Sequence, residues 1–403
     1  MCDLNGVNRI VHFCYSGTSG STRVALNVSR GSARPERHAY VFYGVEPLRE
    51  DYASELRARG CPFVYVPKRH GLDLKCYRVA ATAIARMQPD VVFFHGARSL
   101  PVAFYLRRLA KRGQARIRAG SALVDQGASK ANSCLSPFLV GVQHGPVKEY
   151  AAAVGLSRMA DFTVIVSHEL AESLRRGWFF RRVCPSARMR VILNGVDEEF
   201  WRHCDAGRRA DGHVGLPVGE SAVGMIGTLE RYKDQPTLIL AVGALRRRGV
   251  PVRLELAGAG SRRAALEALV RSEGLADAVK FLGNLSTAAL REAMSGWDVL
   301  AHSTHSEGLS MALLEGMMAG MPIVASDVPG VRQMLEDRRT GLLVPPGDGD
   351  ALAEAIAKLL EDRDSAARLG AAARAHAMEY FSMRRMAREY EEVADRGSSN
   401  SSH

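Results

Sequence analysis

The sequence predicts an α/β fold built from two doubly wound parallel sheets. Short runs rich in Val, Ile and Phe recur along the chain and alternate with helical stretches. These runs are almost continuously apolar, which is typical of strands covered on both faces, as in a parallel sheet of βαβ units. The alternation stops over residues 196–220 and then restarts, so the 403 residues divide into two domains.

Seven runs in the first half are predicted to be strands. The first is RIVHFCY (9–15), which a Gly/Ser-rich loop and a helix from about Ser21 follow. The others are HAYVFYG (38–44), PFVYVP (62–67), DVVFFHG (90–96), FLVGVQHG (138–145), FTVIVS (162–167) and RVILNG (190–195). Helical patterns lie between them, as in YASELRARG and ELAESLRRG, so we expect 1–195 to form the N-terminal domain.

Residues 196–220 are polar and rich in glycine, which predicts a linker. Six further runs then predict the strands of the second domain: SAVGMIG (221–227), VRLELAG (252–258), AVKFLG (278–283), DVLAHS (298–303), PIVAS (322–326) and TGLLV (340–344). We expect this domain to span 221–378, a C-terminal helix over 379–396 to pack back on the first domain, and 397–403 to be a disordered tail.

The composition is that of a globular protein, with 47% apolar and 24% charged residues. The net charge of +11 is uneven. Residues 1–195 hold 29 Lys and Arg against 13 Asp and Glu, a charge of +16, whereas residues 196–403 hold 25 against 30, a charge of −5. Two domains with different partners are indicated.

The seven cysteines are scattered and form no Cys-x-x-Cys pair, which argues against a disulfide framework or a zinc site. The N-terminus lacks the apolar core and cleavage site of a signal peptide, and no run reaches about 18 apolar residues. These observations predict a cytoplasmic protein.

The most informative stretch is HSTHSEGLSMALLEGMMAGMPIVASDVPG (302–330). A strand ends near Ser303, a loop presents Glu307, and a helix carries Glu315 eight residues later. Gly308 allows a ligand to approach the backbone, and the amides at the helix start favour an anion such as a phosphate. The alternative is that Glu307 only complements the helix dipole and that Glu315 is merely exposed.

This stretch resembles the corresponding segment of retaining GT-B glycosyltransferases, particularly glycosyltransferase family four. MIGTLERYKDQPTLILAV (225–242) resembles the first strand and phosphate loop of the family's C-terminal domain, and LELAGAG (254–260) and VKFLGNL (279–285) resemble the next two strand-loop units. RMADFTVIVSHELAESL (158–174) and RVILNGVDEEFW (190–201) resemble the end of its N-terminal domain. The order and spacing agree over nearly all of 9–395.

The resemblance implies a role for each matching residue. Glu315 would hold the ribose hydroxyls of a nucleoside diphosphate sugar, because a carboxylate accepts two hydrogen bonds at once. Glu307 would lie by the donor sugar and the reacting centre, and the amides of Gly308, Leu309 and Ser310 would contact the sugar and phosphates. Lys233 would neutralise the diphosphate leaving group in place of a metal ion. Without the resemblance, Lys233 is an ordinary surface lysine.

The loop after the first strand of the second domain departs from the family. An Arg commonly follows the glycine of this loop, whereas here Thr228 follows Gly227. Thr cannot make a charged, bidentate phosphate contact. Arg231, two residues before Lys233, is the candidate substitute.

In the first domain, SGTSGSTRVALNV (16–28) resembles the family's N-terminal glycine-rich loop, which makes Gly17 and Thr18 candidates to approach the donor phosphate or the acceptor. The family has a His where His144 follows a predicted strand, near the donor sugar and the acceptor. His95 is a second His at a strand end, where a structural role is the alternative. Residues 112–137 are poorly patterned, which predicts either a mobile acceptor loop or a surface insertion.

Asp348-Gly349-Asp350 has the form of a metal-binding Asp-x-Asp, but its place before a helix predicts that Asp348 caps that helix. The family needs no metal, and we expect no metal or other cofactor.

Two basic clusters occur in the first domain. The first cluster lies in 103–118, where we expect a helix with Leu106, Leu109 and Ala110 facing inward. The basic residues of this helix form a cationic face: Arg107, Arg108, Lys111, Arg112, Arg116 and Arg118. The second cluster surrounds Trp178, Phe179 and Phe180 with four arginines: Arg175, Arg176, Arg181 and Arg182. The alternatives are a solvated face and contact with anionic lipid. No nucleic-acid-binding module is recognised.

The sequence thus favours a metal-independent retaining glycosyltransferase that acts in the cleft between two domains, with the leaving phosphate taking the acceptor proton. An anionic or lipid-linked acceptor and peripheral contact with a membrane are expected from the basic domain. A GT-B sugar-nucleotide epimerase or phosphorylase, or a catalytically silent sugar-nucleotide sensor, are the alternatives.

Overall fold

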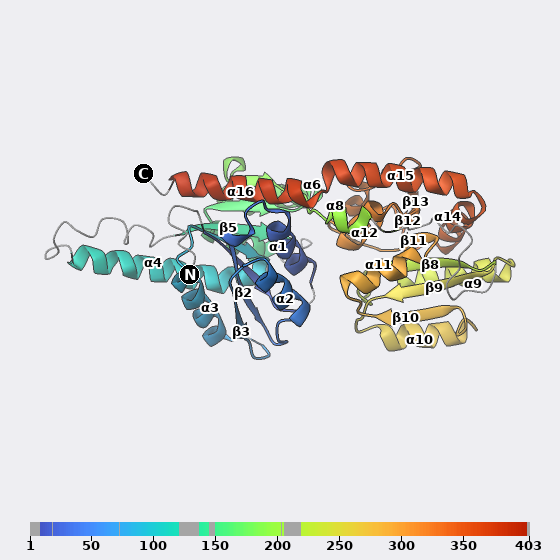
Figure 1. Cartoon of the computed structure of the whole chain (residues 1–403), viewed down its shortest axis with the longest axis horizontal. Coiled ribbons are helices and arrows are strands. Elements are labelled where there is room, and N and C mark those ends of the chain that lie inside the picture. The colour runs from blue at the N-terminus through green and yellow to red at the C-terminus, as the bar shows by residue number, and fades with distance from the viewer. Residues whose placement is uncertain are drawn as a thin grey trace. The chain divides into compact units, whose positions relative to one another are not determined.

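The computed structural model describes residues 9–17, 19–71, 73–120, 137–144, 150–202, 204 and 219–400. The chain divides into two compact units, and Figure 1 shows the elements of each. Unit 1 comprises residues 1–195 and 383–403, and unit 2 comprises Val196–Ser382. Each unit contains one parallel sheet with helices on both faces, as the sequence predicts.

The sheet of unit 1 has seven strands in the order β3-β2-β1-β4-β5-β6-β7, and all neighbours are parallel. The strands are β1 (Ile10–Tyr15), β2 (His38–Gly44), β3 (Phe63–Pro67), β4 (Val91–His95), β5 (Phe138–Gln143), β6 (Phe162–Ile165) and β7 (Met189–Val191). The helices are α1 (Gly20–Gly31), α2 (Glu50–Ala58), α3 (Leu74–Arg86), α4 (Leu100–Gly120), α5 (Tyr150–Met159), α6 (His168–Arg176), α7 (Trp178–Val183) and α16 (Met383–Asn400).

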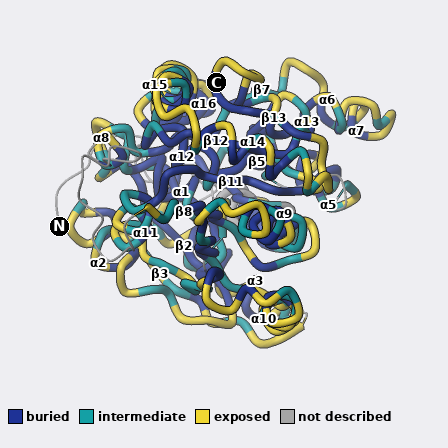
Figure 2. Tube along the Cα trace, turned by 90° about the vertical axis from the view of Figure 1, so that its right-hand side faces the viewer, coloured by how far each residue is buried: buried dark blue, intermediate teal, exposed yellow. Residues whose placement is uncertain are grey.

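Alternate residues of these strands point to opposite faces of the sheet. Val11 and Phe13 of β1 pack with α3 and α4, whereas Cys14 and Tyr40 pack with α1 and α2. The last helix, α16, packs against α1 and over β4 and β5. The inner strands β1, β2, β4 and β5 are largely buried, the edge strands β3 and β7 are partly exposed, and the outer faces of the helices are exposed (Figure 2).

The sheet of unit 2 has six parallel strands in the order β10-β9-β8-β11-β12-β13. The strands are β8 (Ser221–Ile226), β9 (Val252–Ala257), β10 (Val279–Gly283), β11 (Val299–His302), β12 (Ile323–Ser326) and β13 (Leu342–Val344). The helices are α8 (Glu198–Arg202), α9 (Gln235–Arg247), α10 (Arg263–Ser272), α11 (Thr287–Ser295), α12 (Met311–Ala319), α13 (Pro329–Arg332), α14 (Gly349–Glu361) and α15 (Arg363–Tyr380).

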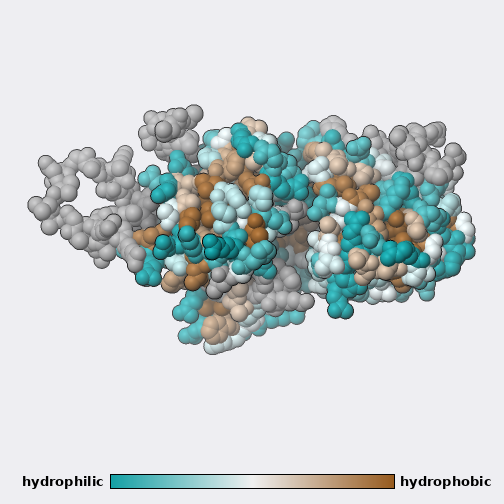
Figure 3. All heavy atoms as spheres, turned by 90° about the horizontal axis from the view of Figure 1, so that it is seen from below, coloured by the Kyte–Doolittle hydropathy of each residue, from teal (hydrophilic) through white to brown (hydrophobic). Residues whose placement is uncertain are grey.

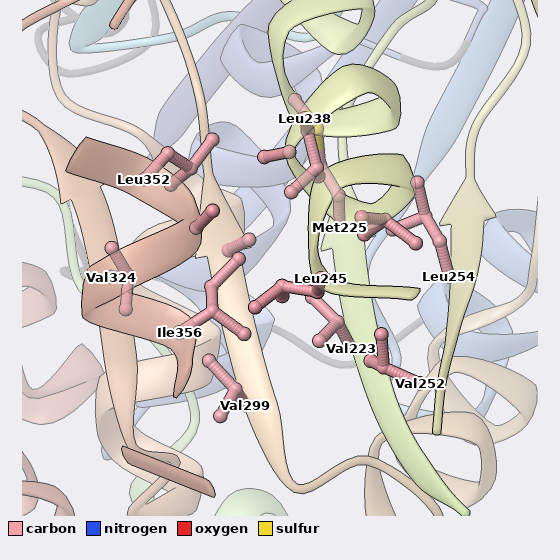
Figure 4. Close-up of a cluster of buried hydrophobic side chains, with 14 of the residues drawn as sticks. Val223, Met225, Leu238, Leu245, Val252, Leu254, Val299, Val324, Leu352 and Ile356 are labelled. Atoms are coloured by element: carbon pink, nitrogen blue, oxygen red, sulfur yellow. The ribbon is translucent and has the colours of Figure 1, made fainter. Parts of the chain in front are cut away.

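The core of unit 2 lies between this sheet and the helices α9 and α14. Figure 4 shows Val223 and Met225 of β8 beside Leu238 and Leu245 of α9, with Ile356 of α14 close by. Apolar side chains from neighbouring strands complete the cluster, so the loop after β8 starts from a closely packed base.

Three segments differ in detail from the sequence prediction. The segment predicted as a linker contains helix α8, whose Trp201 is buried, while residues 203 and 205–218 lie outside the described residues. The C-terminal helix expected over 379–396 runs instead from Met383 to Asn400, after α15 ends at Tyr380. Helix α16 continues to Asn400, so the prediction of disorder from residue 397 is wrong for 397–400.

Asp348 caps α14, since its side chain accepts a hydrogen bond of 2.9 Å from the amide of Ala351. This confirms the capping interpretation of Asp348-Gly349-Asp350. Among the described residues no group of three or more His, Cys, Asp or Glu side chains could hold a metal ion. Cys14, Cys61, Cys76, Cys184 and Cys204 are buried.

No helix in the described ranges is long and apolar enough to cross a membrane. Figure 3 shows polar and apolar residues interspersed over the visible face of each unit.

Candidate active site

In unit 2, the loops after β8 and β11 meet at the carboxyl edge of the sheet. These strands are neighbours, but β9 and β10 continue the sheet on one side and β12 and β13 on the other. Such a reversal of strand order is where doubly wound sheets bind ligands. The two loops carry most of the residues that the sequence singles out.

Lys233 and Glu307 form an ion pair in this place. Their side chains are only 8% and 13% exposed, so water screens the pair weakly. The ring of His302, at the end of β11, lies 3.1 Å from the same carboxylate oxygen of Glu307. Sequence reasoning missed His302, although it opens the 302–330 stretch, because a single His in a buried strand gives no signal of its partner.

The pKa values of this cluster follow from burial and from Lys233. Burial alone raises the pKa of the Glu307 carboxyl, but the Lys233 ammonium and the His302 ring outweigh it and hold the pKa at about 2. Burial and the Lys233 charge lower the pKa of His302. At neutral pH the cluster is therefore a lysine cation, a carboxylate and an uncharged imidazole.

Hydrogen bonds to backbone carbonyl oxygens join the two loops. The hydroxyl of Thr304 and the amide of His305 each donate to the carbonyl oxygen of Tyr232, at 2.8 Å. The hydroxyl of Ser303 donates to the carbonyl oxygen of Asp234, also at 2.8 Å. Lys233 lies between these two anchored residues, so its position is set by the β11 loop as well as by its own.

Gly330, at the start of α13, lies against the backbone of the loop that carries Glu307. A Cβ atom at this position would overlap the carbonyl oxygens of Glu307 and Gly308. Only glycine allows this close approach. The segment after β12 therefore supports the loop that presents Glu307.

Helix α12 follows this loop. Its N-cap is Ser310, whose hydroxyl accepts from the amide of Leu313 at 3.4 Å, and it ends at Gly320, which has a φ of +76°. Leu309 is buried, Gly308 is partly exposed, and Glu315 lies in the second turn with 1% exposure. The amides of Gly308 to Ser310 thus lead directly into a helix N-terminus, which favours an anion.

The loop after β8 begins at Gly227, where a Cβ atom would lie 3.5 Å from the stem of Lys233. The next residue, Thr228, is exposed, and its hydroxyl lies 3.0 Å from that of Tyr232. Arg231 is exposed on the same loop. Lys233 is therefore the buried cation of this loop, and Arg231 lies on its surface.

In unit 1 the corresponding reversal of strand order falls between β1 and β4. Gly17 follows β1, where a Cβ atom would press on the ring of Tyr15, while Thr18 lies outside the described residues. His95 ends β4, and His144 follows β5, the next strand in the sheet. Their rings are in contact, with His95 Nδ1 and His144 Nε2 3.2 Å apart.

The basic clusters of unit 1 differ in exposure. On α4, Leu106 and Ala110 are buried, but the expectation for Leu109 is wrong, since it is 37% exposed. Arg107 does not belong to a free cationic face, because it forms an ion pair with Asp161. The side chains of Arg112, Arg116 and Arg118 lie outside the described part of the chain.

On α6 and α7, Trp178 is 63% exposed and Phe179 is 49% exposed, and four exposed arginines surround them: Arg175, Arg176, Arg181 and Arg182. Phe180, which the sequence groups with these rings, is instead buried in the core of unit 1.

The fold has close counterparts among solved structures. HepE from Anabaena, in complex with UDP and glucose, aligns with a TM-score of 0.74 at 19% identity, covering 96% of this chain and 99% of that one. Sucrose-phosphate synthase from Thermosynechococcus elongatus aligns with a TM-score of 0.73 at 18% identity and the same coverage. With its two parallel sheets, the chain thus has the GT-B fold.

Two family models match consecutive parts of the chain, Glycosyltransferase Family 4 over residues 18–200 and Glycosyl transferases group 1 over residues 209–376. The chain belongs to this family of glycosyltransferases.

Curated relatives match about half of the chain. The GDP-mannose-dependent alpha-(1-6)-phosphatidylinositol monomannoside mannosyltransferase of Mycobacterium tuberculosis is 32% identical over 227 residues, 54% of this chain and 58% of the relative. The D-inositol 3-phosphate glycosyltransferase of Corynebacterium urealyticum is 30% identical over 206 residues, 48% of each chain. The chain thus spans about half the length of the curated relatives it matches.

Proposed function

We propose that this protein is a retaining, metal-independent glycosyltransferase that moves a sugar from a nucleoside diphosphate sugar to an acceptor hydroxyl. The observation that carries the proposal is the buried Lys233–Glu307 pair at the reversal of strand order in unit 2. A preorganised cation there stabilises the charge that grows on a leaving diphosphate. Relatives and structural neighbours that use GDP-mannose or hold UDP support a nucleotide-sugar donor.

Lys233 can serve Glu307 and a phosphate together. An ammonium carries three N–H donors, and a single carboxylate oxygen of Glu307 takes one of them. The remaining donors are available to phosphate oxygens, and the amides at the start of α12 supply further donors for the same anion. The site thus needs no metal ion to compensate the diphosphate charge.

The carboxylates have separate tasks in this proposal. Glu307 stays ionised at neutral pH and lies next to Lys233, so it orients the ammonium and faces the sugar side of the donor. Glu315, buried in α12, holds the ribose hydroxyls, whose hydrogen bonds compensate the burial of its charge. Gly227, Thr228 and Arg231 line the phosphate side, Gly17 and Thr18 approach the donor phosphate or the acceptor, and His144 lies near the donor sugar and the acceptor.

A transferase assay tests the proposal. Release of nucleoside diphosphate is measured with UDP-, GDP- and ADP-sugars and with inositol phosphate or glycolipid acceptors, in the presence of EDTA. We expect transfer with one donor, an anomeric configuration in the product that matches the donor, and loss of transfer in Glu315→Gln with the fold retained. An epimerised sugar or phosphate-dependent cleavage without acceptor would instead show an epimerase or a phosphorylase, and donor binding without turnover would show a sensor.

We also propose a cytoplasmic protein that contacts anionic membranes through α6 and α7. Trp178 and Phe179 are exposed apolar rings, and the four exposed arginines around them would each contribute about 1 kcal/mol near an anionic surface. Flotation with vesicles of phosphatidylcholine and phosphatidylserine tests this contact. Salt-sensitive binding is expected, and equal recovery with neutral vesicles would contradict it.

A further inference from the structure

Four histidines of unit 1 form a continuous hydrogen-bonded chain across the sheet. His38 is in β2, His12 in β1, His95 in β4, and His144 just after β5. Nitrogen–nitrogen distances are 3.0 Å from His38 to His12, 3.0 Å from His12 to His95, and 3.2 Å from His95 to His144. At the other end, His38 lies 3.4 Å from Glu391 of α16.

The parallel register explains this regular diagonal. Ile10 of β1 pairs with His38 of β2, so His12 lies two residues nearer the carboxyl end of the sheet. Phe93 of β4 pairs with His12, so His95 lies two residues further in the same direction. His95 is level with Val142 of β5, which puts His144 two residues beyond it. Each step crosses one strand and rises about 6.5 Å along the sheet. The chain therefore runs from beneath α16 to the carboxyl edge.

The rings are enclosed by aromatic side chains. His12 stacks against Tyr40 and Phe93, and the ring of His95 lies parallel to that of Tyr390. His12 and His38 are fully buried and His95 is 4% exposed. Burial lowers the pKa of all four imidazoles, which keeps them uncharged at neutral pH.

Every contact in the chain has the same direction. Nε2 of His144 faces Nδ1 of His95, Nε2 of His95 faces Nδ1 of His12, and Nε2 of His12 faces Nδ1 of His38. A neutral imidazole has one N–H and one lone pair. If two neighbours were different tautomers, their contact would hold either two hydrogens or none. The four rings must therefore all carry the hydrogen on Nε2 or all carry it on Nδ1.

Glu391 decides between these two states. Its carboxylate oxygen faces Nε2 of His38 and also accepts a hydrogen bond from the hydroxyl of Ser32. Burial raises the pKa of Glu391, but its hydrogen bonds with His38 and Ser32 outweigh this and lower it, so the group is ionised. An ionised carboxylate only accepts, so His38 must donate from Nε2. Arg37, the nearby cation, is itself paired with Asp395.

We infer that Glu391 fixes the tautomer of His144 through this chain, so that His144 carries its hydrogen on Nε2 and offers the Nδ1 lone pair as a hydrogen-bond acceptor. No described residue bonds to that Nδ1 atom. Under the proposed function, on which this use rests, the group that it receives is the acceptor hydroxyl. Glu391 is then a positioning residue that acts through three intervening histidines.

The chain is suited to hold a tautomer and not to conduct protons continuously. If Nδ1 of His144 took a proton and each ring passed one on, Glu391 would become a carboxylic acid and all four rings would end with the hydrogen on Nδ1. A second proton could pass only after every ring was reset, and buried rings cannot turn over freely. A stable, uniform tautomer is the state that the geometry supports.

Nitrogen-15 NMR of the imidazole rings tests the inference on the full chain. Two-bond nitrogen–proton correlations distinguish the two neutral tautomers, and single His→Gln variants assign the four rings among the twelve histidines. We expect all four to be Nε2–H at pH 7. In Glu391→Ala we expect an Nδ1–H population at His144, which three intervening histidines separate from the substituted position.

The matched control is Glu392→Gln, on the same helix, which removes an exposed ion pair with Arg190 and leaves the tautomers unchanged. An Nδ1–H or charged ring among the four in the unsubstituted protein would overturn the inference, as would an unchanged His144 in Glu391→Ala. These spectra need no substrate. A protein that transfers no sugar would refute the proposed function without altering the tautomer result.

Discussion

The Lys233–Glu307 pair makes the stability of unit 2 depend on pH in a defined direction. The Glu307 carboxyl has a pKa of about 2 in the folded protein, against 4.5 without the fold. Because the folded pKa is depressed, the stabilisation is fully present above pH 4.5 and is lost as the pH falls towards 2. One pH unit corresponds to about 1.4 kcal/mol, so the contribution at neutral pH is about 3 kcal/mol.

Removing the Lys233 cation alone should lower the free energy of unfolding more than removing the charges of both Lys233 and Glu307. Lys233→Met leaves a buried carboxylate without its partner, and we expect a loss of about 3–5 kcal/mol at pH 7. The double variant Lys233→Met, Glu307→Gln should lose less than the single one. In Lys233→Met, burial raises the pKa of Glu307, so the loss should shrink as the pH falls towards 4. Protonation of His302 at low pH would also compensate the Glu307 charge in this variant and so reduce the loss.

Tryptophan fluorescence during urea unfolding measures this effect. Trp201 and Trp297 are buried in unit 2, and Trp178, the third tryptophan of the sequence, is exposed in unit 1. A Trp178→Phe background therefore makes the signal report on unit 2 alone. Lys358→Met, at an exposed position of α14, is the control and should change the free energy of unfolding by less than about 0.5 kcal/mol. If the free energy of unfolding of Lys233→Met stayed within about 1 kcal/mol of that of its parent at both pH 7 and pH 4, the reasoning would be refuted.

Two further predictions concern packing and membrane contact. Gly330→Ala should destabilise unit 2 by about 1–3 kcal/mol and lower transferase activity, because its Cβ overlaps the backbone of the Glu307 loop. Gly349→Ala is the control, since the nearest atom to its Cβ would be 3.8 Å away. Equal activity of the two variants would contradict the role of Gly330. Trp178→Ser with Phe179→Ser should reduce flotation with anionic vesicles while leaving the melting temperature unchanged, since both rings are exposed; flotation equal to the parent would show that α7 does not touch the lipid.

The sequence was sufficient to predict the strands and the order of elements. Near-continuous apolar runs mark strands buried on both faces, and the helical patterns between them are the crossover connections that parallel strands need. The sequence predicts that the C-terminal helix begins at 379, whereas α16 begins at Met383; the position differs because the helical pattern continues through the break and gives no local signal of it.

Contacts between distant residues were beyond the sequence pattern. Lys233 and Glu307 could be singled out by their motifs, but their ion pair depends on β8 and β11 being neighbours. His12 and His38 were hidden in apolar runs, where an isolated His gives no sign of a partner. Only the register of β2, β1, β4 and β5 brings them into one chain with His95 and His144.

Calorimetric titration with nucleosides and nucleoside diphosphates tests the central claim, that the carboxyl edge of unit 2 binds a nucleotide-sugar donor through Lys233 and Glu315. UDP, GDP and ADP are titrated into the unsubstituted protein, Lys233→Met and Glu315→Gln. A lost hydrogen bond to a charged group costs about 1.5–3 kcal/mol, or roughly 10- to 150-fold in affinity. We predict that one diphosphate binds, that Lys233→Met weakens this diphosphate but not its nucleoside, and that Glu315→Gln weakens both. Equal affinity of all three proteins for every diphosphate would contradict the claim.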